Sequence, residues 1–246
     1  MKKWIVLWTL GLFFITTQQS HAEKYLWGVE DLQYFPLYSS EGETYLGYAS
    51  DLFNLFEKTE KLEMEIKPFP VKRLYDNFFA GKIDFKFPDH PNWQTDLRKD
   101  IQIIYSDPVI DYIDGCMVLP AKVGKGLSSI KVLGTVRGFT AWDYLDQIKS
   151  GSIKVSENNS FTGLLQQVIM GRVDCAYINI TVARYQLNEI LKKPGGAVFD
   201  PSLPHTSDSY KISSKKHPEV IEKFNKFLNG HAGEIAVLKA KYNISP

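Results

Sequence analysis

Two segments of the chain share a pattern that leads to a polar residue able to bind a ligand. Gly-Lys-Ile-Asp at 81–84 and Gly-Arg-Val-Asp at 171–174 stand 90 residues apart, and each closes an apolar helical pattern and opens a strand-like run. Five residues past each aspartate come Asp89 and Asn179, at the predicted strand ends. A carboxylate and a carboxamide there could hydrogen-bond a small polar ligand. The pattern predicts a duplicated unit with a cleft between two lobes.

Three arginines could bind an anionic group of such a ligand. Arg98 could hold a carboxylate through two parallel hydrogen bonds, and its alternative is a solvated loop charge. Arg73 opens a predicted helix at a strand end, where ligands of α/β sheets gather. Arg137 begins the turn that leads to Thr140, where free helix amides would add to anion binding. The alternative for Thr140 is a plain helix N-cap.

Aromatic residues in predicted cleft loops could stack on a ligand. Tyr34, Phe35 and Trp93 lie outside the helical stripes, and Phe139 precedes the threonine of the second turn. Core packing is the alternative for the first three residues. The sequence therefore predicts that these rings contact a ligand.

The two repeated aspartates, Asp84 and Asp174, could form a functional carboxylate pair. A strand start lies at the sheet edge away from the cleft, so they are predicted to be structural and to satisfy backbone amides.

Metal, cofactor and catalytic chemistry find little support in the sequence. The five histidines, at positions 21, 90, 205, 217 and 231, lack metal-ligand spacing. No phosphate-cradling glycine loop and no nucleophile elbow occurs. No metal and no cofactor is expected, and His90 beside Asp89 is the only arrangement near the predicted cleft suited to acid–base work.

Strands alternate with helices along most of the chain, which predicts the α/β class with a mainly parallel sheet flanked by helices in each lobe. Ser50 and Ser160 are predicted helix caps, and Gly81 is a predicted helix stop. Residues 23–111 and 206–246 are assigned to the first lobe and residues 112–205 to the second. Two crossings would form a hinge.

The N-terminus predicts export. Lys2 and Lys3 precede an apolar run over residues 4–15 and a polar stretch ending at Ala22, so residues 1–22 are read as a cleavable signal peptide and the mature chain as periplasmic. Removing two lysines changes the formal net charge from +1 to −1. A charge near zero argues against a nucleic-acid partner.

Cys116 and Cys175 are the only cysteines. Both lie in apolar strand-like runs that the predicted fold makes neighbours. Export permits a disulfide, but adjacency alone does not meet the geometry of one, so buried free thiols are the favoured prediction.

Several motifs in order resemble one known family. They are the aromatic-proline turn 34–36, the helix start 47–52, the two repeated units, Arg98 before residues 105–108, and the final helix start at His217. Together the chain resembles the periplasmic solute-binding proteins of the amino-acid type, extracellular family 3. The resemblance implies the periplasmic binding protein type II fold, in which two lobes joined by two strands close on a ligand.

The resemblance also implies roles for particular residues. Arg98 matches the arginine that pairs with a ligand carboxylate, and Thr140 matches a contact of the second lobe. Asn179 stands where the family has an acid for the ligand amine, and a neutral amide cannot supply that charge. Asp89, and with it Asp31, could offer negative charge instead.

The resulting prediction is a monomeric, non-enzymatic protein that captures a small polar solute by hinge closure and passes it to a membrane transporter permease. Two alternatives stay open. One is an enzyme on the same scaffold, similar to cyclohexadienyl dehydratase and using His90 and Asp89. The other is a ligand-sensing partner of a membrane receptor.

Overall fold

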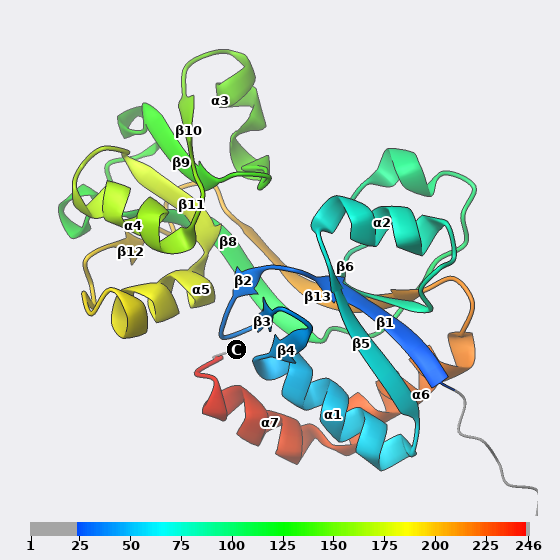
Figure 1. The fold of residues 1–246 in the computed structure, drawn as a ribbon. Coiled ribbons are helices and arrows are strands. Elements are labelled where there is room, and N and C mark those ends of the chain that lie inside the picture. The colour runs from blue at the N-terminus through cyan, green and yellow to red at the C-terminus, as the bar shows by residue number, and fades with distance from the viewer. Residues whose placement is uncertain (1–23, 245–246) are drawn as a thin grey trace, which may run out of the picture.

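The computed structural model, which describes residues 24–244, shows two α/β lobes connected by two long strands (Figure 1). These strands are β8 (Ile110–Val118) and β13 (Thr206–Ser214), which pair antiparallel near the middle of the molecule. Beyond that pairing, β13 runs beside β6 (Phe85–Asp89) of the first lobe. β8 runs beside β11 (Cys175–Asn179) of the second. The fold is therefore the predicted one.

The first lobe is organised around β1 (Lys24–Glu30), which pairs in parallel with β5 (Glu63–Phe69) on one side and with β6 on the other. Apolar residues at helical spacing bury one side of α1 against this sheet, and the rings of Trp27 and Phe53 lie 5.2 Å apart. The helices of this lobe are α1 (Tyr48–Glu60), α2 (Val71–Phe79), α6 (Pro218–Gly230) and α7 (Ala232–Lys241).

The second lobe repeats this order of strands. β9 (Val132–Val136) is central and pairs in parallel with β10 (Lys154–Asn158) and with β11, as β1 does with β5 and β6. The two repeated units thus lead into equivalent strands, β6 and β11. Around them lie α3 (Leu145–Lys149), α4 (Phe161–Ile169), α5 (Ile180–Tyr185) with a π-helical turn at Gln186–Ile190, and β12 (Val198–Phe199).

Some short elements differ from the sequence prediction. The predicted turn after β1 contains part of a small separate sheet of β2 (Gln33–Tyr34), β3 (Tyr38–Glu41) and β4 (Thr44–Leu46). A short strand, β7 (Ile104–Tyr105), precedes β8 and pairs with β13. Single 3₁₀ turns occur at Thr95–Arg98, Pro120–Lys122, Leu127–Ser129 and Trp142–Tyr144.

The helix ends were partly predicted. Ser160 caps α4 by accepting a hydrogen bond from the Gly163 amide, and Gly81 follows α2 with a φ of +69°, both as predicted. The prediction for Ser50 is wrong. α1 begins at Tyr48, so Ser50 lies within the helix and its hydroxyl donates to the carbonyl of Tyr45.

The repeated aspartates are structural, as predicted. The Asp84 carboxylate accepts the Leu26 amide at 2.9 Å, and Asp174 accepts the amides of Lys131 and Val132, each at 2.9 Å. Each carboxylate therefore accepts hydrogen bonds from backbone amides near the N-terminal end of its lobe's central strand, β1 or β9.

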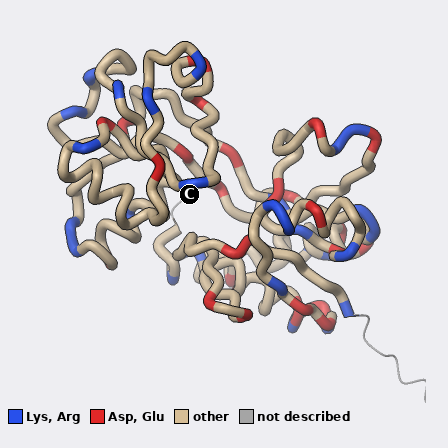
Figure 2. Tube along the Cα trace, turned by 45° about the horizontal axis from the view of Figure 1, so that its top comes forward, with Lys and Arg blue, Asp and Glu red and all other residues tan. Residues whose placement is uncertain are grey.

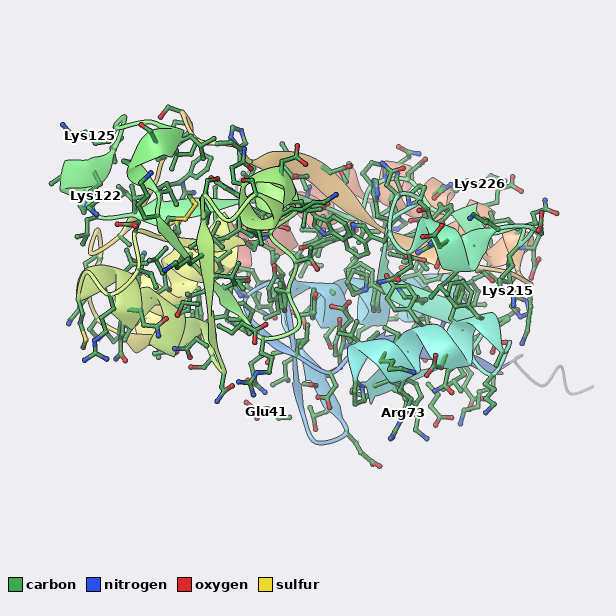
Figure 3. The ribbon with its side chains drawn as sticks, turned by 90° about the horizontal axis from the view of Figure 1, so that it is seen from above. Glu41, Arg73, Lys122, Lys125, Lys215 and Lys226 are labelled. Atoms are coloured by element: carbon green, nitrogen blue, oxygen red, sulfur yellow. A yellow bond between two sulfur atoms is a disulfide. The ribbon has the colours of Figure 1, made fainter. Side chains whose placement is uncertain are left out.

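The prediction of free thiols is wrong, because Cys116 and Cys175 form a disulfide (Figure 3). β8 and β11 are paired antiparallel, which brings the two Cα atoms to 5.4 Å, inside the range that a disulfide requires. The bond ties the connecting strand β8 to the sheet of the second lobe.

The predicted signal peptide at 1–22 lies outside the described residues. No helix in the described part, residues 24–244, is long and apolar enough to cross a membrane. The lobe boundaries at 111/112 and 205/206 fall at the connecting strands and stay a prediction.

Candidate functional site

A cavity of about 360 Å³ lies between the lobes. Both lobes and both connecting strands contribute to its wall, and its volume suits a small organic molecule. The wall includes Tyr34 and Trp93 from the first lobe, Phe139, Thr140 and Asn179 from the second, and Tyr112, Asp114 and Tyr210 from the connecting strands.

Five of the predicted ligand contacts therefore meet in one place, namely Tyr34, Trp93, Phe139, Thr140 and Asn179. The remaining six, namely Asp31, Phe35, Arg73, Asp89, Arg98 and Arg137, do not line this cavity. These eleven residues had been predicted from their positions at strand ends and in cleft loops, and some of them from the resemblance.

Asp89 and Arg98 bind each other rather than facing the cavity. The Arg98 guanidinium contacts both Asp89 carboxylate oxygens, at 2.6 and 3.3 Å, and Lys86 lies 3.1 Å from the same carboxylate. Asp89 and Lys86 are fully buried. Burial opposes the charge on Asp89, but the positive charges of Lys86 and Arg98 hold its pKa below the ordinary value.

The other four predicted contacts lie elsewhere. The Asp31 carboxylate accepts the Ser40 hydroxyl and lines a separate groove. Phe35 packs on Tyr185 of the second lobe, with ring centres 4.6 Å apart. Arg73 is exposed on α2 (Figure 3), and Arg137 is exposed with its Nε 3.6 Å from Glu157.

Asp114 is the most informative residue that the sequence prediction missed. It lies on β8 directly opposite Asn179 on β11, so both side chains point to the same face of the sheet. The signal in the sequence was a charged residue inside an apolar strand run, which seldom occurs without a partner or a function. Its register opposite Asn179 required the strand pairing, which the sequence does not give.

These two side chains bring unsatisfied polar atoms to the cavity wall. Asp114 Oδ1 and Asn179 Nδ2 are buried, and neither has a hydrogen-bond partner among the described residues. Asn179 Oδ1 accepts the Val182 amide at 3.1 Å and so caps α5. A buried acceptor and a buried donor of this kind are costly unless a bound molecule completes them.

Burial raises the pKa of Asp114 to about 7. The adjacent Asn179 amide, a hydrogen-bond donor, lowers this pKa in part, and the negative charge of Asp143 raises it further. Asp143 is itself held by the hydroxyls of Tyr177 and Thr206, at 2.6 and 2.9 Å. The second lobe and its connecting strands thus present an acidic wall. Figure 2 shows acidic residues along the strands that run between the lobes.

His90 pairs with a different acid from the one predicted. Its Nε2 lies 3.0 Å from Asp208, and its Nδ1 accepts the Asn92 amide at 3.2 Å. Asp89 instead accepts the His90 backbone amide. Both ring nitrogens of His90 are therefore engaged with groups of the protein itself.

Aromatic rings form much of the cavity wall. Tyr112 and Tyr210 stack with ring centres 4.2 Å apart, and Tyr34 of the first lobe stacks on Phe139 of the second at 5.9 Å. The second contact joins the lobes beside the cavity, so the two lobes already touch at that point. Among residues 24–244, no group of three or more metal-binding side chains occurs.

No protein-family model and no curated protein matches the sequence. Solved structures match closely in shape. An ancestral arginine-binding protein bound to arginine shows a TM-score of 0.67 at 22% identity, over 90% of this chain and 99% of its own. The GluR0 ligand-binding core with L-glutamate shows a TM-score of 0.70 at 13% identity, over 91% and 99%.

A histidine kinase sensor domain similar to periplasmic binding proteins also matches, with a TM-score of 0.66 at 16% identity over 90% of this chain and 96% of its own. At such identities the likeness establishes the fold. The two-lobed fold expected from the resemblance is confirmed.

Proposed function

We propose that this chain is a solute-binding protein that captures a small organic molecule between its lobes by hinge closure. The observation that carries the proposal is a cavity whose wall comes from both lobes and from both connecting strands. A ligand held there contacts both lobes at once, so binding favours the closed arrangement.

Export of the chain to the periplasm belongs to this proposal. The Cys116–Cys175 disulfide supports it, because structural disulfides persist in oxidising compartments. The partner would be a membrane transporter permease or a membrane receptor, with the mature chain acting as a monomer. The structural neighbours include a periplasmic binding protein of an arginine transport system and a histidine kinase sensor domain, so transport and sensing each have a precedent on this fold.

Binding is favoured over catalysis by the state of His90. The enzyme predicted from the resemblance would use His90 with Asp89 for proton transfer. His90 instead contacts Asp208 and the Asn92 amide through its two ring nitrogens, and Asp89 is bound by Arg98 and Lys86. Turnover of a cyclic carboxylic acid that disappears in His90→Ala would favour the enzyme instead.

The experiment is a thermal-unfolding screen of the mature chain against a broad library of small solutes, followed by small-angle X-ray scattering with each stabilising solute. A bound solute should raise the unfolding temperature and reduce the radius of gyration, because it favours lobe closure.

Two matched variants locate the effect. Thr140→Trp places a large ring at the cavity wall and should abolish both responses. Thr44→Trp adds the same ring to the exposed β4 and should leave both unchanged. The proposal fails if no solute stabilises the wild type, or if stabilising solutes leave the radius of gyration unchanged.

A further inference from the structure

One acid in the cavity wall has no basic partner among the described residues. The wall contains the acids Glu30, Asp114 and Asp208 and, over residues 24–244, no lysine or arginine. Asp208 lies 3.0 Å from His90, and Lys86 lies near Glu30, so Asp114 is the acid that these residues leave without a basic group beside it. A ligand carboxylate entering this cavity would meet like charges without a cationic partner, which is unfavourable in a cleft that excludes water.

Arg98, which the resemblance assigns to the ligand carboxylate, is already occupied by a carboxylate of the protein itself. Asp89 fills both arms of the guanidinium, and the Arg98 side chain is only 8% exposed. Arg98 also donates to the carbonyl of Trp93 and to the Tyr105 hydroxyl. The internal ion pair leaves this arginine with no donor pair for a ligand carboxylate.

Lys86 is the other cation near this region, and it too is occupied. Its ammonium group donates to the Pro88 carbonyl at 2.6 Å, lies 3.1 Å from Asp89 and sits 4.1 Å from the ring centre of Tyr75. The side chain is fully buried. Lys86 therefore balances Asp89 and the nearby Glu30 instead of serving an incoming anion.

In the described part of the chain, the cavity wall instead lacks a positively charged partner for an acid. Asp114 Oδ1 is buried at the cavity wall without a hydrogen-bond donor among the described residues, and Asn179 Nδ2 beside it lacks an acceptor. A ligand N–H group carrying positive charge would complete Asp114. A neutral acceptor on the same ligand would complete Asn179.

The aromatic wall suits the same ligand. Tyr34, Phe139, Tyr112 and Tyr210 present rings around the cavity, and ring faces attract organic cations. These rings also cover an alkyl chain favourably, since they bury apolar surface.

We propose that the cleft binds a small organic cation that bears N–H donors and no carboxylate, with Asp114 as its counter-ion. The inference rests on the proposed function and specifies the ligand class of the same site. Asp114, on the strand next to Asn179, supplies the acid that position 179 lacks. Asp89 binds Arg98 in the way that the resemblance expected of a ligand carboxylate.

Pairs of compounds that differ only by a carboxylate test this inference. Agmatine and arginine, cadaverine and lysine, and histamine and histidine would each be titrated calorimetrically into the mature chain. In at least one pair, the amine should bind at least tenfold more tightly than its amino acid.

Asp114→Asn should weaken binding of that amine at least tenfold while the variant stays folded by circular dichroism. Asp111→Asn is the matched control, because Asp111 lies on the same strand, is exposed and accepts only the Ser209 hydroxyl among the described residues. It should leave the amine affinity unchanged.

Tighter or equal binding of the amino acids would overturn the inference, and so would an unchanged amine affinity in Asp114→Asn. Both outcomes would leave the solute-binding function standing, because a ligand would still be bound. If no compound of either series binds, the inference fails, and the solute-library screen decides the function separately.

Discussion

Asp89 holds two buried cations in place, and this gives it a large effect on stability. Replacing it by alanine would leave Lys86 and Arg98 without their shared counter-ion in the interior. Breaking a buried ion pair from one side costs about 3–5 kcal/mol. We therefore expect Asp89→Ala to lower the free energy of unfolding in urea by that amount.

The control for this prediction is Asp96→Ala, which removes an exposed pair with Lys99. It should change the free energy of unfolding by less than about 1 kcal/mol. Equal effects of the two substitutions would show that the Asp89 cluster does not stabilise the fold.

Asp114 should make stability depend on pH near neutrality. Its folded pKa is about 7, well above the ordinary value of 3.8, so the folded protein keeps a proton that the unfolded chain releases. The contribution of Asp114 to stability is therefore greatest below pH 4, falls by about 1.4 kcal/mol per pH unit up to pH 7, and is flat above. Urea unfolding between pH 4 and 8 measures it.

Asp114→Asn removes the titrating group and should flatten that part of the pH profile. The variant should gain stability relative to the wild type as the pH rises from 4 to 7. A constant difference between the two proteins across this range would contradict the raised pKa.

At the scale of residues, the sequence showed which positions carry an unusual residue better than it showed which residues contact each other. The departure at Asn179 and the unusual Asp89 were visible because a known pattern was broken there. Asp114 and the Asp89–Arg98 pair were not, since each depends on which strands or loops meet in space.

The disulfide links β8 to β11, and its loss should affect the second lobe. It closes a loop across 59 residues, and native disulfides of this kind contribute about 2–4 kcal/mol. The double substitution Cys116→Ala and Cys175→Ala should lower the urea midpoint accordingly. Reduction of the wild type by dithiothreitol should shift the midpoint in the same way, and an unshifted midpoint in both would contradict this role.

At the scale of elements, the regular helices and strands were predictable because their apolar periodicity is strong. α6 begins at Pro218, directly after the helix start predicted at His217. The short sheet of β2, β3 and β4 was missed, since strands of two to four residues carry too little periodic signal.

Contacts between the lobes outside the cavity should set how often the empty protein closes. Phe35 of the first lobe packs on Tyr185 of the second. Phe35→Ala should therefore increase the radius of gyration without ligand and weaken solute binding, because less of the protein occupies the closed state.

Phe69→Ala is the matched control, since Phe69 is also a half-buried phenylalanine but packs on a cluster within the first lobe. It should leave the radius of gyration unchanged. A similar expansion in both variants would mean that lost packing, rather than lobe contact, is being measured.

At the scale of the whole molecule, the duplication read from the two repeated units predicted two equivalent lobes, and the strand orders agree with it. The wall of the cavity could not be predicted in full, because the connecting strands supply Tyr112, Asp114 and Tyr210. Those residues lie outside the repeated unit.

The central claim is a cleft between two lobes that holds an organic cation without a carboxylate. Native mass spectrometry of the chain purified without denaturation, followed by identification of the molecule released on unfolding, tests it most directly. The released molecule should contain a basic nitrogen and no carboxylate, and it should be absent from Thr140→Trp. Release of an α-amino acid, or of any other carboxylate, would contradict the claim.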